Sequence, residues 1–266
     1  MLGPEKKEGH LPLSELIPGF EAGLLPIHKA ASEIKGWLSP REVRFLSVLM
    51  THPTATGRVV ELGCYHGKST VVLAKASDLA TKETLISVDP IDPTPVLTNL
   101  DLFKVSEKVE FINKRSDEFW PTWEEPIRFF WNDGANDRET VAQDFESGLP
   151  WLQDGAIIAF HDILNRSGER IHVFIDKVLR SPHFAASGLV GSIGWSQYRK
   201  RAEDAVEYQP AKAKLQKKLE RLRPFTDLNK PRGGLLRRYY YRSLRWFVPH
   251  SQKEIEYWMR HVAFPA

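Results

Sequence analysis

VVELGCYHGKST, residues 59–70, joins a short β-branched strand, in which Glu61 is the acidic residue, to a turn through Gly63 and Gly67 and to a helix start. Glycine lets the backbone approach a ligand closely, and a helix start presents unpaired N–H groups. The stretch therefore predicts a cradle for a nucleotide-like cofactor. The dinucleotide pattern G-x-G-x-x-G needs bare backbone at its second glycine, where this chain has Tyr65, so the sequence disfavours NAD.

Strands and helices alternate on both sides of this stretch. The first strand is followed by apolar strands expected at residues 84–90, 109–113, 127–134 and 155–163. Helices are expected between them at residues 69–80, 95–106, 138–148 and 169–180. A capping box, SPRE at residues 39–42, predicts a helix before the first strand, and residues 187–200 predict two short strands around Gly194. This alternation is typical of a parallel α/β sheet.

Polar side chains occur at the carboxyl ends of the predicted strands, where an open parallel sheet holds its ligand. Asp89 comes about twenty residues after the glycine turn, a spacing that lets a carboxylate accept both hydroxyls of a bound ribose. Ser116 could contact an adenine edge, although helix capping explains it equally well. We expect one crevice that is lined by Glu61, Asp89, Asp133, His161 and Asp162.

Two runs resemble class I S-adenosylmethionine (SAM) dependent methyltransferases. The pattern E-x-G-x-x-x-G at residues 61–67 resembles their motif I. Residues 129–163, FFWNDGANDRETVAQDFESGLPWLQDGAIIAFHDI, resemble the bacterial members that modify sugar and natural-product hydroxyls, with an acidic D-G turn and a strand ending in H-D. Where many relatives carry D-G-D-H and G-G, this chain has D-G-A-N at residues 133–136 and D-G at residues 154–155.

The resemblance covers residues 58–200 and implies both a fold and a cofactor. The fold is a Rossmann-like, doubly wound, mostly parallel seven-stranded sheet with an antiparallel closing strand. The cofactor is SAM, with Glu61 at its amino acid end and Asp89 at its ribose. The residues expected to bind it are Glu61, Gly63, Cys64, Tyr65, Gly67, Ser69, Thr70, Asp89, Ser116 and Asp133.

Methyl transfer to a hydroxyl requires removal of its proton, by a positioned base or by a divalent cation that lowers the hydroxyl pKa. The resemblance places the ligands of such a cation, Mg²⁺ or Mn²⁺, on Asp133, His161 and Asp162. Without a metal, His161 is the expected general base, since its ordinary pKa lies nearest the working pH. The same three residues are the catalytic candidates in both cases. A helix cap and a buried strand-end histidine are the structural alternative for His161 and Asp162.

The function expected from this resemblance is O-methyl transfer to a hydroxyl of a sugar, a glycolipid or a glycosylated natural product. An RNA methyltransferase that uses the basic C-terminal segment is the alternative enzyme. An alternative of another class is a protein that binds SAM without catalysis, for which the D-G-A-N departure is the support.

The chain has 266 residues, a net charge of +3 and one cysteine, so it forms no intramolecular disulfide. It shows no membrane-spanning apolar run and no apolar signal core at its start, and we expect a cytoplasmic protein. We expect a helical N-terminal extension over residues 1–57, the SAM-binding core over residues 58–200 and a basic, aromatic, helical extension over residues 201–266.

Residues 199–245 hold 15 Lys and Arg against 5 Asp and Glu, and the remainder of the chain is net acidic. Helices are expected at residues 211–225 and 235–249. Three roles compete: a packing or dimerisation arm, an interfacial segment for an anionic membrane or a lipid-linked glycan, and, ranked last, a nucleic-acid surface. The packing arm is favoured because six residues fit one wide helical face: Leu235, Leu236, Tyr239, Tyr240, Leu244 and Phe247.

Overall fold

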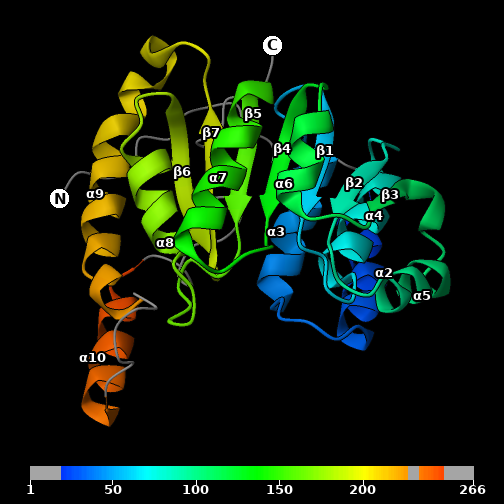
Figure 1. Ribbon diagram of the computed structural model, residues 1–266, viewed down its shortest axis with the longest axis horizontal. Coiled ribbons are helices and arrows are strands. Elements are labelled where there is room, and N and C mark those ends of the chain that lie inside the picture. The colour runs from blue at the N-terminus through cyan, green and yellow to red at the C-terminus, as the bar shows by residue number, and fades with distance from the viewer. Residues whose placement is uncertain (1–18, 227–233, 249–266) are drawn as a thin grey trace.

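The computed structural model describes residues 19–226 and 234–248, and its centre is a seven-stranded sheet (Figure 1). The strand order is β3-β2-β1-β4-β5-β7-β6. Six strands run in one direction, and β7 alone runs antiparallel to its neighbours β5 and β6. The strands are β1 (Arg58–Leu62), β2 (Leu85–Val88), β3 (Val109–Ile112), β4 (Ile127–Asn132), β5 (Leu152–Phe160), β6 (Phe184–Val190) and β7 (Ile193–Tyr198). The predicted Rossmann-like sheet with an antiparallel closing strand is confirmed.

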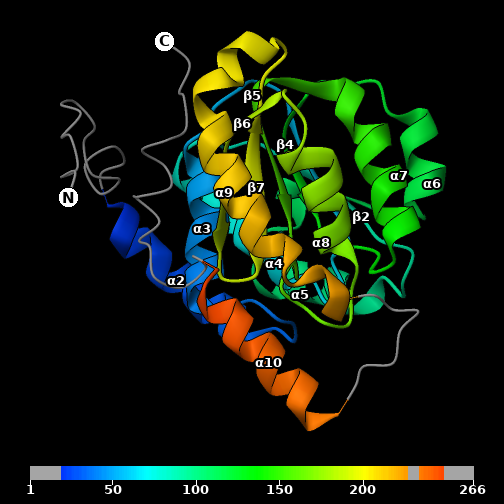
Figure 2. The same ribbon diagram turned by 90° about the vertical axis from the view of Figure 1, so that its left-hand side faces the viewer.

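Helices cover both faces of the sheet (Figures 1 and 2). Because side chains alternate along a strand, Val59 and Phe129 face one apolar core while Val60 and Phe130 face the other. The first core is closed by α2 (Phe20–Glu33), α3 (Pro40–Thr51), α4 (Lys68–Leu79) and α5 (Thr94–Leu102). The second is closed by α6 (Ser116–Phe119), α7 (Arg138–Gly148), α8 (Arg170–Val173), the π-helical turn η4 (Phe174–Leu179), α9 (Gln209–Glu220) and α10 (Leu235–Trp246).

The register of the parallel strands aligns their carboxyl ends. Leu62 pairs with both Val88 and Asn132, and Asn132 pairs with Phe160. The residues that follow these four positions therefore begin side by side at one edge of the sheet. This alignment positions the site.

The hairpin that closes the sheet turns elsewhere than the sequence indicated. The turn is at Gly191, whose φ of 60° is in the left-handed region, and Gly194 lies within β7. Gly194 is needed for packing, because a Cβ there would lie 2.7 Å from a side-chain carbon of Ile163. The predicted capping box is present, with Ser39 and Glu42 bonding reciprocally at the start of α3.

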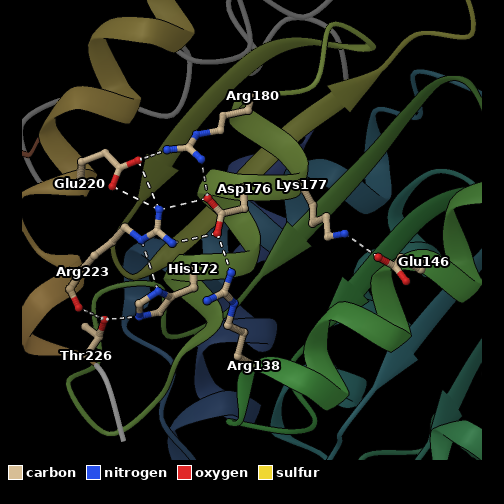
Figure 3. Close-up of polar contacts among 9 residues, drawn as sticks. All are labelled: Arg138, Glu146, His172, Asp176, Lys177, Arg180, Glu220, Arg223 and Thr226. Carbon is tan, nitrogen blue, oxygen red and sulfur yellow. Dashed lines mark hydrogen bonds and ion pairs between the residues drawn. The ribbon is translucent and has the colours of Figure 1, made fainter. Parts of the chain in front are cut away.

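The C-terminal segment is attached to the sheet through α9, which packs on β6 and η4. Figure 3 shows the polar contacts beside this packing: Asp176 of η4 accepts from Arg138, Arg180 and Arg223. Arg223 also bonds to Glu220. One carboxylate thereby joins the end of the α9 segment to α7 and η4.

Most of the apolar face expected on α10 does not pack on the core of the described chain. The helix contacts the core through Tyr241, Leu244 and Val248. The other five residues of the expected face are exposed: Leu235, Leu236, Tyr239, Tyr240 and Phe247. Among the described residues, no helix has the length and apolar content needed to cross a bilayer.

Candidate functional site

A cavity of about 560 Å³ opens at the carboxyl edge of the sheet. Its walls come from the loops that follow β1 to β5 and from residues 35–38, which precede α3. The predicted site residues that line it are Gly63, Cys64, Tyr65, Ser69, Asp89, Ser116, Asp133, His161 and Asp162. Glu61, Gly67 and Thr70 are not part of its wall.

The loop after β1 has the form expected of a cofactor cradle. Gly63 has a φ of 82°, and a Cβ there would lie 2.4 Å from Gly134 Cα, so only glycine fits between the loops after β1 and β4. Gly67 has the same φ of 82° and begins α4. Tyr65 adopts a positive φ of 51° without being glycine. Gly63 thus brings bare backbone to the cavity wall, and Gly67 completes the turn into α4.

Asp89 fixes this loop against β2. Its Oδ2 accepts from the backbone N–H groups of Cys64 (2.8 Å) and Tyr65 (2.9 Å), and its Oδ1 accepts from Ile91 N–H (3.0 Å). A carboxylate oxygen has room for a further donor, so Asp89 can still receive a hydroxyl from the cavity.

Glu61 lies beneath the cradle and is not among the residues that line the cavity, whereas the sequence placed it in the crevice. It is fully buried, and its carboxylate accepts from the hydroxyls of Ser69 (2.5 Å), Thr70 (2.7 Å) and Ser87 (2.7 Å). Burial raises the pKa of Glu61 to about 7, against the lowering effect of these bonds. In this structure Glu61 ties β1 and β2 to the start of α4.

Ser116 and Asp144 form a polar wall that sequence reasoning found only in part. Ser116 begins α6, and its side chain bonds to the carboxylate of Asp144 on α7. Burial raises the pKa of Asp144 to about 6, although the bond from Ser116 lowers it. Asp144 was missed because one acidic residue within a surface helix carries no sequence signal.

Asp133 and His161 meet where β4 and β5 end. His161 Nδ1 lies 3.1 Å from Asp133 Oδ2, and Nε2 lies 3.9 Å from Glu42 Oε1. Burial lowers the pKa of His161, but the carboxylates of Asp133, Asp162 and Glu42 outweigh burial and raise it to about 9. Asp133 is the more accessible member of the pair, with 24% of its side chain exposed against 4% for His161.

Arg170 is a site residue that the sequence did not reveal. It is buried on α8, and its guanidinium donates to the carbonyl oxygens of Gly134 (2.9 Å) and Ala135 (2.8 Å). Its Nη1 lies 3.3 Å from Asp133 Oδ1. Arg170 therefore holds the loop after β4 in place and occupies the second oxygen of Asp133.

These contacts do not fit the predicted metal centre. The two oxygens of Asp133 face Arg170 and His161, and Asp162 accepts from Asn165 Nδ2 at 3.0 Å. Within residues 19–226 and 234–248, no three His, Cys, Asp or Glu side chains are grouped as metal ligands. Asp133, His161 and Asp162 do not form an Mg²⁺ or Mn²⁺ site here, because a guanidinium and an imidazole hold the carboxylate that would be its central ligand.

The segment before α3 forms the outer wall of the cavity. Trp37 stacks on Tyr65 with 5.6 Å between ring centroids, and Lys35 Nζ lies 5.3 Å from the centroid of the Tyr65 ring. Lys68 Nζ donates to Gly36 O at 2.8 Å. Burial raises the pKa of the Cys64 thiol, which disfavours the thiolate form that a nucleophilic cysteine needs.

Comparison with known proteins shows which domain and which solved structures this chain is similar to. Residues 60–163 match a family described as a methyltransferase domain. The O-methyltransferase from Bacillus cereus in complex with SAH is 19% identical, with 70% of this chain and 94% of that chain covered and a TM-score of 0.51. Cofactor-bound Rv0187 from MTB is 18% identical, with coverages of 69% and 91% and a TM-score of 0.52.

A third similar structure is the O-methyltransferase TomG from Streptomyces achromogenes, involved in tomaymycin synthesis, in complex with SAM. It is 16% identical, covers 71% of this chain and 100% of its own, and has a TM-score of 0.50. At these identities the likeness is one of fold.

Proposed function

We propose that this chain, in which residues 60–163 form a methyltransferase domain, is a SAM-dependent O-methyltransferase whose acceptor is a hydroxyl of a sugar, a glycolipid or a glycosylated natural product. The observation that carries the proposal is the Asp133–His161 pair, which opens on the same cavity as the glycine cradle. Three further polar residues that line the cavity, Asn136, Asp137 and Asp162, support a polyhydroxylated acceptor.

The cradle residues fit SAM. The cavity wall suits a nucleoside, because it offers bare backbone at Gly63 and the polar side chains of Asp89 and Ser116. SAM is a nucleoside without the pyrophosphate that a dinucleotide would bring to this loop. SAM would supply a methyl group on a sulfonium, ready for in-line displacement. In this proposal Glu61 supports the cradle from beneath, and Thr70 supports it through Glu61.

The protein's own task is then to orient the hydroxyl and to accept its proton. Asp133 is the exposed member of the pair, so it contacts the hydroxyl, and the deprotonated Asp133–His161 pair takes up the hydroxyl proton. Arg170 keeps the Asp133 carboxylate in place during this transfer. No metal ion is part of the proposal, because these contacts engage both oxygens of Asp133.

Calorimetry with SAM tests the cradle first. Turnover on saccharide-containing acceptors and on RNA, each with and without chelator, then tests the reaction. We expect SAM binding and chelator-resistant methylation of a saccharide hydroxyl. Methylation of RNA alone would favour the alternative enzyme, for which the basic segment at residues 199–245 is the supporting observation. SAM binding without any turnover would favour the non-catalytic alternative.

A further inference from the structure

Helix α10 presents an apolar face to solvent. Leu236 and Trp246 are 87% and 80% exposed, and Leu235, Tyr239, Tyr240 and Phe247 are each more than half exposed. At 100° per residue these six side chains fall within an arc of about 140° on the helix. Burying such a face stabilises a protein, so a face this apolar and this exposed indicates an interaction surface.

The two other sides of α10 have different roles. Tyr241, Leu244 and Val248 form the stripe that packs on the core. Beyond that stripe lie Arg238, Arg242 and Arg245, and helix α10 contains no acidic residue. Among the described residues, none forms an ion pair with these three arginines. The exposed surface of α10 therefore consists of an apolar face bordered by a row of positive charges.

The attachment of α10 places this surface near the cavity. Tyr241 Oη donates to Leu164 O at 2.7 Å, and the Arg166 guanidinium lies 5.6 Å from the centroid of the Tyr241 ring. Leu164 and Arg166 belong to the loop that follows β5 and begins with His161 and Asp162 of the cavity wall. In Figures 1 and 2, α10 extends beyond the edge at which the strand arrows end.

We propose that α10 is an interfacial helix that binds an anionic membrane surface. Aliphatic and aromatic side chains next to arginines are the composition of helices that lie in the plane of the headgroups, where Trp and Tyr are favoured. Phosphate headgroups complement the arginine row. Nucleic acid would leave Leu235 and Leu236 without a partner, and a second copy of α10 would bring like charges together. This membrane-binding proposal does not depend on the proposed methyl-transfer reaction.

Co-sedimentation of the full chain with vesicles tests the proposal. We expect binding to mixed phosphatidylcholine–phosphatidylserine vesicles, little binding to phosphatidylcholine alone, and release by added salt. Arg238→Gln/Arg242→Gln should weaken binding about 25-fold, since one basic residue near an anionic surface contributes about fivefold. Leu236→Ser/Trp246→Ser should abolish binding by removing the two most exposed apolar side chains.

Lys217→Gln/Lys218→Gln is the matched control. It removes the same charge from exposed positions on α9, which belongs to the same basic segment but has no exposed apolar face. This control should bind vesicles as the unchanged chain does. The proposal is overturned if Lys217→Gln/Lys218→Gln loses as much vesicle binding as Arg238→Gln/Arg242→Gln does. It is also overturned if the unchanged chain does not bind vesicles at low salt. A third outcome also overturns it: the chain forms a dimer or binds RNA, and Leu236→Ser/Trp246→Ser disrupts that complex while vesicle binding is absent or unchanged. SAM calorimetry on the same variants should be unchanged, which separates this outcome from failure of the proposed reaction.

Discussion

His161 Nδ1 lies 3.1 Å from Asp133 Oδ2 because both residues immediately follow paired strands. Asn132 and Phe160 are register partners at the ends of β4 and β5, and His161 N–H donates to Asn132 O at 3.1 Å. The register of β4 and β5 therefore brings the two side chains together. Their closeness couples the protonation of His161 to the charge of Asp133.

That coupling predicts a pH dependence of methyl transfer. Asp133 stabilises the imidazolium form of His161 and raises its pKa to about 9, whereas a proton acceptor must be unprotonated. The turnover rate at saturating SAM should therefore rise with pH and level off above about 9. Rates that are constant between neutral pH and pH values above this pKa would contradict a role for the pair.

Substitution of His161 isolates its contribution to the chemical step. His161→Ala should lower turnover by about 10²- to 10⁴-fold, the usual contribution of proton transfer, while SAM affinity stays within a few-fold. Calorimetry on the same preparation supplies the control for binding. Undiminished turnover in His161→Ala would show that the pair is not the proton acceptor.

Gly63 and Gly134 offer a matched test of the cradle. Gly63→Ala places a Cβ 2.4 Å from Gly134 Cα at a φ of 82°, and we expect a loss of about 2 kcal/mol or more in unfolding free energy, with loss of SAM binding. Gly134→Ala meets nothing closer than 3.7 Å. It should stay within about 0.5 kcal/mol of the unchanged chain in denaturant unfolding. Equal effects would mean that the two loops are not in close contact.

Glu61 predicts how stability varies with pH. Its folded pKa, raised to about 7, exceeds the ordinary value of 4.5, so the unfolded chain releases this proton first. The stabilisation is full below pH 4.5 and is lost as the pH rises to about 7, a change of about 3 kcal/mol.

Glu61→Gln provides the comparison, because the amide does not titrate. Urea unfolding at several pH values should show that the difference in unfolding free energy between Glu61→Gln and the unchanged chain shifts in favour of Glu61→Gln between pH 4.5 and 7. A difference that is independent of pH would mean that Glu61 has the same pKa in the folded and the unfolded chain.

The position of Glu61 shows what a strand pattern can and cannot predict about the direction of a side chain. The sequence placed it at the end of the first strand, but β1 continues to Leu62, so Glu61 lies within the strand. Side chains alternate along a strand, and residue 61 shares the face of Val59. That face is covered by α4, whose Ser69 and Thr70 take up the carboxylate. Residues directly after a strand, such as Asp89 and Asp133, are free of this alternation, and both line the cavity.

The remaining differences arise from contacts between distant segments. Arg170 reaches the loop after β4 from α8, and Trp37 reaches Tyr65 from the segment before α3. Neither contact has a fixed spacing in sequence. The apolar pattern of α10 likewise predicted a helix with a wide apolar face, but not that the neighbouring stripe with Tyr241 would be the one that packs.

The Asp176 cluster in Figure 3 predicts that one carboxylate secures the C-terminal segment. Asp176 has 17% of its side chain exposed and accepts from Arg138, Arg180 and Arg223 at 2.8–3.0 Å. Asp176→Ala removes the carboxylate that lies among three guanidinium groups and leaves Glu220 as the acidic partner of Arg180 and Arg223. We expect a loss of about 2 kcal/mol in unfolding free energy.

Lys177 and Glu146 supply the control, because they form a single pair beside the cluster with side chains 42% and 58% exposed. Glu146→Ala should cost about 0.5 kcal/mol or less, as exposed pairs usually do. Urea unfolding in low and high salt measures both variants. If Asp176→Ala costs no more than Glu146→Ala, the cluster is only a set of solvated surface charges, and α9 is then held by its apolar contacts and by the bonds from Lys212 to Ser181 O and Phe184 O.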